Sequence, residues 1–327
     1  MSAPDIGLHD GKRRFDSDRA FKGVALAAGL LVLAILALIA VSMLNQAWPA
    51  LRETGLDFIT SKKWVPNDPD GPGPLTEHFG ALAFVYGTFV VSLIALVLAV
   101  PVAVGIALFT TEVAHRRIRP VVTTVIDLLA AVPSVVYGLW GILVLAPNIQ
   151  GLYGNVADAV HPIPVLNTLF GENAQGRSFM TAGIILAIMI TPIITSVSRE
   201  VLNTVPSGEK AAALALGATR WEMIRGAVLP HSFGGIVGAV MLGLGRAMGE
   251  TIAVALVIGS SPQIVGNLFK SGDAMPSVIV NLFGEAGGNF RSALIAIGVL
   301  LFAMTIVVNV AARFVVERAE TRLRGAA

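Results

Sequence analysis

Two opposite charges, Arg246 and Glu250, lie four positions apart inside a long apolar stretch, residues 233–259. The stretch is long enough to cross a bilayer. An arginine at the centre of a membrane helix costs at least about 2.5–3.5 kcal/mol, so such a residue is functional by default. On one continuous helix the two side chains share a face. Another backbone can approach that face closely at its glycines, Gly243, Gly245 and Gly249.

This pair of charges suits the passage of a protonated oxyanion. A guanidinium attracts an anion, and its N–H donors match two oxygens of a tetrahedral oxyanion. A carboxylate beside it repels a fully ionised anion but accepts a hydrogen bond from a protonated one. Phosphate keeps a proton near neutral pH, whereas sulfate does not. The alternative is an Arg246–Glu250 ion pair within the helix, worth about 0.2–0.5 kcal/mol. We favour a substrate pathway.

The composition is that of an integral membrane protein. Hydrophobic residues make up 55% of the 327 positions and charged residues only 13%, and the mean hydropathy is +0.77. The chain has no cysteine, which excludes disulfides, thiolate metal sites and cysteine nucleophiles. The net charge is only +2 and the basic residues are dispersed, so nucleic-acid binding has no support.

Hydropathy predicts an all-α membrane protein with six transmembrane helices. The first apolar run is too long for a signal peptide and lacks a small-residue cleavage site, so we interpret it as a retained helix. A membrane domain, residues 23–312, is expected between an N-terminal segment, 1–22, and a tail, 313–327. The predicted helices cover residues 23–45, 81–111, 120–146, 179–197, 233–259 and 292–312.

Three of the connecting segments differ in character. Residues 64–74 contain so many prolines, glycines and aspartates that no regular structure is expected there. Residues 147–177 are predicted to be a loop with a short interfacial helix, and residues 260–291 are predicted to be a further loop.

The distribution of basic residues predicts the orientation. With six helices, both ends of the chain lie on the same side of the membrane. The turn after the second helix and the segment at residues 198–232 lie on that side too, and together these parts carry 16 of the 23 Lys and Arg. The positive-inside rule makes it cytoplasmic.

A few other polar residues in the predicted helices are candidates for function. Ser134 and Tyr137 lie one helical turn apart and can line the same cavity as Arg246. We favour bundle packing for them, with each hydroxyl bonded to neighbouring backbone. His115 belongs to a solvated basic turn and His161 lacks a second ligand nearby, so no metal site is expected. The sequence also lacks a Walker A motif, and we predict no catalytic residue.

The segment at residues 198–232 has the organisation of a coupling loop. An alanine-rich helix at residues 211–215 is followed by a break at Gly217, then by an amphipathic helix at residues 219–228 that ends at Leu229 and Pro230. We take residues 209–217 as the candidate coupling helix. A membrane-surface helix without a partner is the alternative.

This pattern resembles the cytoplasmic loop of bacterial ABC-importer permeases, in which Glu-Ala-Ala precedes a glycine and a terminal Leu-Pro. Five positions of this chain fit: Ala212, Ala213, Gly217, Leu229 and Pro230. Two depart from the pattern. Ala211 replaces the glutamate, with Glu209 two positions earlier, and Ala227 replaces an isoleucine. The missing glutamate removes one expected salt bridge to the ATPase.

Two longer segments carry a more specific resemblance. DLLAAVPSVVYGLWG at residues 127–141 and MLGLGRAMGET at residues 241–251 closely resemble the PstC-type membrane subunit of the bacterial high-affinity phosphate importer. The resemblance runs in order from about residue 17 to the tail. It implies the type I ABC-importer permease fold in the inner (plasma) membrane, and it assigns the family's charged pathway residues to Arg246 and Glu250.

The same resemblance implies a multi-subunit importer. This chain would pair with a homologous second permease as a heterodimer, bind two cytoplasmic ATPase subunits and receive phosphate from an external phosphate-binding protein. The chain itself would need no cofactor, since ATP and Mg are used by the ATPase. Three rivals remain: an ABC permease for molybdate, tungstate or sulfate, an ATPase-independent anion transporter or channel, and a membrane scaffold that does not transport.

Overall fold

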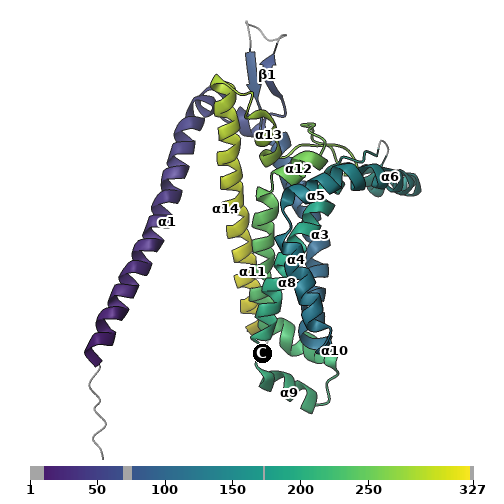
Figure 1. Cartoon of the computed structure of the whole chain (residues 1–327). Helices are drawn as coiled ribbons and strands as arrows, with labels where there is room; N and C mark the ends of the chain where they lie inside the picture. The colour runs from purple at the N-terminus through teal and green to yellow at the C-terminus, as the bar shows by residue number, and fades with distance from the viewer. Residues whose placement is uncertain (1–10, 69–75, 172–173, 325–327) are drawn as a thin grey trace, which may run out of the picture.

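A computed structural model describes residues 11–68, 76–171 and 174–324. This part of the chain is mostly helical, with one small β-hairpin at one end (Figure 1). Six of its helices are long and apolar enough to cross a membrane, in agreement with the number predicted. Helix α9 (Ser207–Ala215), the start of α1 (Gly11–Thr54) and the end of α14 (Gly288–Arg324) lie at the end opposite the hairpin (Figure 1). We refer to the two ends as the α9 end and the hairpin end.

The first and last long helices flank the bundle. Helix α1 (Gly11–Thr54) packs against α14 (Gly288–Arg324) near the hairpin end and diverges from the rest of the molecule toward the α9 end (Figure 1). Both helices extend beyond the predicted spans. Most apolar side chains of α1 are exposed, which is the pattern expected of a helix surrounded by lipid or by another subunit.

Three helices form the centre of the bundle. Helix α8 (Phe179–Asn203) packs against α3 (Leu82–Leu108) and against α11 (Leu229–Gly249). Small residues bring these helices together. A Cβ atom at Gly183 would lie 2.3 Å from Ile94, and one at Gly243 would lie 2.7 Å from Ile194. The main apolar core lies along these contacts.

The third predicted helix is broken near its middle. Helix α4 (Arg119–Ala131) ends before Val132 and Pro133, and α5 (Ser134–Trp140) begins after them. Proline has no backbone N–H to donate and disfavours helical geometry at the preceding residue. The chain then continues through a π-helical turn, η2 (Gly141–Leu145), into α6 (Ala146–Val160), which runs sideways from the bundle (Figure 1). A short helix α7 (Pro164–Phe170) follows, so the segment predicted to contain one short helix contains two.

The fifth predicted helix is also broken, and the prediction of one continuous span over residues 233–259 is wrong. Helix α11 ends at Gly249, Glu250 is extended, and a second helix, α12 (Ile252–Val257), begins two residues later. The parts of the two broken helices that follow the breaks, α5 and α12, pack together. A Cβ atom at Gly138 of α5 would lie 2.9 Å from the Cα atom of Ala253 in α12. An interrupted helix inside a membrane domain marks a place where backbone lines a cavity.

The hairpin corrects another expectation. Strand β1 (Trp64–Asp68) pairs antiparallel with β2 (Thr76–Phe79), although residues 64–74 were expected to be irregular. Pro66 is tolerated because the strand register shifts between Val65 and Asp68. A short helix α2 (Asp57–Thr60) precedes the hairpin. Aromatic rings anchor the hairpin base to the bundle: Trp64, Phe79, Phe84 and Phe290. The predicted irregular residues 69–74 lie outside the described residues.

The predicted third loop is not loosely attached. Residues 258–274, which we call the docked loop, are held against α3 and α8 before helix α13 (Met275–Leu282) begins. Tyr86 donates its hydroxyl to the carbonyl of Val265 at 2.6 Å, and the amide of Met275 donates to the Thr88 hydroxyl at 2.9 Å. Between them, Gly87 approaches the carbonyl of Asp273. Residues 272–278 are buried.

At the α9 end the predicted alanine-rich helix is present as α9. Gly217 follows with a positive φ of 86°, the backbone conformation that favours glycine after a helix. Thr219 then caps α10 (Arg220–Met223), but this helix does not end at Pro230 as predicted. It continues through the π-helical turn η3 (Ile224–Val228) directly into α11. The wider turn fits the missing N–H of Pro230, and η2 precedes Pro147 in the same way.

Candidate functional site

Arg246 lies in the last turn of α11, just before the helix break. Its side chain is exposed on the outside of the single chain and makes no hydrogen bond or ion pair with any described residue. The C-terminal end of a helix carries partial negative charge, which stabilises a cation there by about 0.3–1 kcal/mol. This is less than the cost of the charge in a bilayer. The guanidinium therefore needs a further partner, which the described part of the chain does not provide.

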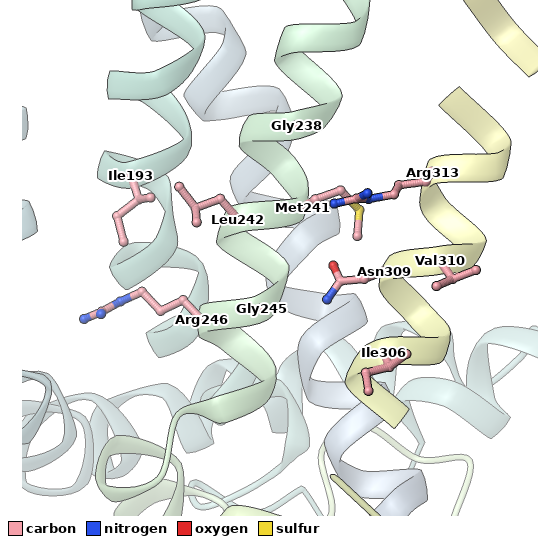
Figure 2. Close-up of a pocket in the computed structure, with 10 residues that line it drawn as sticks. All are labelled: Ile193, Gly238, Met241, Leu242, Gly245, Arg246, Ile306, Asn309, Val310 and Arg313. Atoms are coloured by element: carbon pink, nitrogen blue, oxygen red, sulfur yellow. The ribbon is translucent and has the colours of Figure 1, made fainter. Parts of the chain in front are cut away.

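Arg246 opens onto a groove of about 760 Å³. Figure 2 shows Arg246 and Leu242 projecting from α11 on the side of α8, whereas Asn309 and Arg313 reach from α14 toward the opposite side of α11. The two arginines thus lie on different sides of the helix. The groove is lined by residues of α8, α11 and α14: Ile193, Gly238, Met241, Leu242, Gly245, Arg246, Ile306, Asn309, Val310 and Arg313.

Glu250 faces away from this groove, and the prediction that it shares a helical face with Arg246 is wrong. The break turns its half-buried side chain inward, where it borders a very small cavity with Thr88 and Ser92 of α3. One carboxylate oxygen accepts a hydrogen bond from the amide of Ala253 at 3.3 Å, which caps the first turn of α12. No ion pair joins Glu250 to Arg246 among the described residues. The two charges have separate surroundings in this conformation.

The other two candidate pathway residues lie at the first helix break. Tyr137 donates its hydroxyl to the carbonyl of Leu129 at 2.9 Å, which bridges the break between α4 and α5. This agrees with the interpretation that the hydroxyl bonds to neighbouring backbone. Tyr137 lies in α5, next to Gly138, which packs against α12, so the two broken helices meet just beyond the break that follows Arg246. Ser134 is half-buried at the start of α5.

The candidate coupling residues gather at the α9 end. Helix α9 contains Glu209, Ala211, Ala212 and Ala213, and none of its residues is fully buried. Ala213 packs onto a small apolar core that includes Leu202, Met223 and Val228, and Leu229 packs beside it. Pro230 lies in the first turn of α11. Large apolar side chains remain exposed nearby, with Leu216 90% exposed and Trp221 64% exposed.

Sequence reasoning missed the ion pairs that hold α9. Lys210 binds Glu112, in the π-helical turn that follows α3, with 2.5 Å between Nζ and Oε1, and Nδ1 of His231 in α11 lies 3.3 Å from Oε2 of Glu209. These partners are 98 and 22 positions apart in the sequence, so no local pattern pairs them.

Within the described residues no group of three His, Asp or Glu could hold a metal ion.

Most of this chain is similar to membrane components of known transport systems. Residues 99–324 match the family model described as "Binding-protein-dependent transport system inner membrane component". A phosphate transport system permease protein PstC of Mesorhizobium japonicum is 42% identical over 313 residues, which cover 95% of this chain and 93% of the relative. A PstC 2 protein of Mycobacterium tuberculosis is 41% identical over 96% of both chains. The phosphate transport system permease protein PstC of Haemophilus influenzae is 39% identical, and the match covers 91% of this chain and 92% of the relative.

Solved structures share the fold at low sequence identity. A chain of a bacterial alginate ABC transporter, in complex with an alginate pentasaccharide-bound periplasmic protein, aligns with a TM-score of 0.56 and 18% identity, covering 93% of this chain and 97% of that one. A chain of the inward-facing MetNI methionine ABC transporter aligns with a TM-score of 0.53 and 16% identity, covering 73% and 94%. This chain therefore has the type I ABC-importer permease fold.

Proposed function

Because this chain belongs to the family of binding-protein-dependent transport system inner membrane components, we propose that it is the permease subunit of an ATP-driven importer of inorganic phosphate. The substrate is supported by the phosphate permeases that are about 40% identical over more than 90% of the chain. The subunit forms half of a translocation pathway that alternates between the two sides of the membrane and carries no ATPase site of its own.

One observation carries the transport mechanism. Arg246 places a cation that no described residue pairs with beside a helix break, on a groove that opens to the outside of the single chain. A homologous second permease packed on this face would complete the groove as a cavity, and a phosphate anion would neutralise the guanidinium while it passes. A bidentate guanidinium–phosphate contact is directional and charge-assisted.

The α9 end supports an interaction with a protein partner outside the membrane. Exposed leucine and tryptophan side chains beside a short helix are typical of an interface. We place α9 in the groove of a cytoplasmic ATPase, with a second ATPase under the partner permease. ATP and Mg are then used by those subunits. This puts both termini in the cytoplasm of a multi-pass inner-membrane protein, with the hairpin end toward an external phosphate-binding protein.

The choice among oxyanions rests on the relatives and not on Glu250. Glu250 points into its own chain in this conformation and accepts a hydrogen bond from Ala253, so it does not select a protonated anion at Arg246 here. A permease for molybdate, tungstate or sulfate remains the alternative within the same family.

The proposal is tested with the assembled complex, purified through a tag on this chain and reconstituted in lipid. Phosphate-loaded binding protein should stimulate ATP hydrolysis and drive phosphate uptake, whereas a sulfate-loaded homologue should do neither. Equal stimulation by both would overturn the phosphate assignment. Uptake that persists after nucleotide is depleted would overturn the ATP-driven mechanism and favour a channel or secondary transporter.

A further inference from the structure

Helix α9 has few apolar contacts to fix its orientation. It is nine residues long and has no fully buried residue. Only Ala213 packs onto the apolar core beneath it. A short helix of this kind is marginal without tertiary contacts, so its position depends on polar contacts with the rest of the chain.

Two consecutive residues of α9 supply those contacts in two directions. Lys210 binds Glu112 in the π-helical turn η1 (Phe109–Val113), which continues α3. The carboxylate of Glu209 lies 3.3 Å from Nδ1 of His231 in the first turn of α11, a contact that is partly exposed to solvent. The side chain of Glu112 is only 7% exposed. Ion pairs on a surface contribute little, but removing one partner of a buried carboxylate leaves it uncompensated and is costly.

A third contact extends this connection to α4. The guanidinium of Arg119, the first residue of α4, donates to the carbonyl of Thr111, next to Glu112 in η1. Through η1, α9 is therefore linked to α4, and through His231 it is linked directly to α11. Helices α4 and α11 are the parts of the two broken helices that precede the breaks. Arg246 lies fifteen residues beyond His231, or about 22 Å along α11.

We propose that Glu112, Lys210, Glu209 and His231 are positioning residues that make α9 move as one body with α4 and α11. Movement imposed on α9 then reaches both helix breaks together and changes the surroundings of Arg246. This inference rests on the proposed function, because it assigns the intramolecular link between an ATPase bound at α9 and the phosphate pathway. It also gives Glu209 a role in place of the missing family glutamate at Ala211, with a partner inside this chain.

The test measures phosphate taken up per ATP hydrolysed by the reconstituted complex. Lys210→Gln and Glu112→Gln should leave the complex assembled and ATP hydrolysis active, while the transport ratio falls at least threefold. Lys210→Arg keeps the ion pair and should retain the wild-type ratio. The exchanged pair Glu112→Lys with Lys210→Glu should recover at least half of the ratio lost in the single variants. Such a rescue is not expected if Lys210 only contacts the ATPase.

An unchanged ratio in Lys210→Gln and Glu112→Gln would overturn the proposal. Uptake and hydrolysis that fall in proportion would also overturn it, because they indicate a role in folding or in ATPase docking. If a single variant fails to assemble, the exchanged pair decides: an assembled complex with a recovered ratio supports the link, and one with the ratio still lost overturns it. The wild-type complex is measured first, so failure of phosphate uptake itself is seen separately.

Discussion

The contact between Gly87 and the docked loop gives a prediction whose size follows from the structure. A Cβ atom at Gly87 would lie 1.8 Å from the carbonyl oxygen of Asp273, whereas real Cβ contacts almost never fall below 3.0 Å. Gly87→Ala therefore forces a displacement of about 1.2 Å between α3 and the backbone of the docked loop. Overpacking of this kind costs about 1–3 kcal/mol. The flanking hydrogen bonds of Tyr86 and Thr88 would be strained with it.

Gly105→Ala is the matched control, because Gly105 lies on the same helix and a Cβ atom there would meet, apart from its own stretch of helix, no atom of the described residues within 4 Å. Alanine in a helix interior is favoured over glycine by about 0.5–1 kcal/mol. In thermal unfolding of the purified complex we expect a midpoint several degrees lower for Gly87→Ala and unchanged or slightly higher for Gly105→Ala. Equal midpoints for the two variants would refute the close approach of α3 and the docked loop.

Two further predictions concern the carboxyl groups of Glu250 and Asp273. Glu250→Ala removes the acceptor for the Ala253 amide and should cost about 1 kcal/mol, seen as roughly fivefold faster hydrogen exchange in α12, whereas Glu250→Gln keeps an oxygen there. Equal exchange in both would contradict the capping role. Burial raises the pKa of Asp273 from 3.8 to about 6, so the folded state binds its proton more tightly and stability falls as pH rises between those values, by up to about 3 kcal/mol. Asp273→Asn should therefore unfold at a higher temperature than the wild type at pH 7.5 and show a flatter dependence between pH 4.5 and 6.5. The same pH dependence of the unfolding midpoint in the wild type and the variant would contradict this assignment.

The sequence predicted the parts of the fold that depend on hydropathy and local signals. Six apolar runs gave six candidate spans, and the alanine-rich run before Gly217 gave α9. Neither helix was predicted to be interrupted, and Pro133 indicated only a kink, although each break has a local signal. Pro133 lies at the first break, and Gly249 precedes the second. Hydropathy averages over such positions, because apolar residues continue on both sides of each break.

The surroundings of the candidate site could not be predicted from the sequence. Spacing alone put Arg246 and Glu250 on one face, but that inference holds only for a continuous helix. The helix ends before Glu250, whose extended backbone turns its side chain away from Arg246. Long-range contacts were equally inaccessible: the pairing of Lys210 with Glu112 and the burial of residues 272–278 depend on how distant helices pack. Arg246 was nevertheless predicted to be functional from its residue type, because an uncompensated charge in an apolar span requires a partner. This is the residue that opens onto the groove.

The most direct test of the central claim is phosphate uptake by reconstituted complexes that carry Arg246→Ala, with Arg313→Ala as control. Both variants remove one arginine from the same groove, but Arg313 reaches the other side of α11 (Figure 2). We predict that Arg246→Ala assembles normally and loses at least about tenfold in uptake, equivalent to about 1.4 kcal/mol, while Arg313→Ala transports like the wild type. Normal uptake by an assembled Arg246→Ala complex would contradict the account.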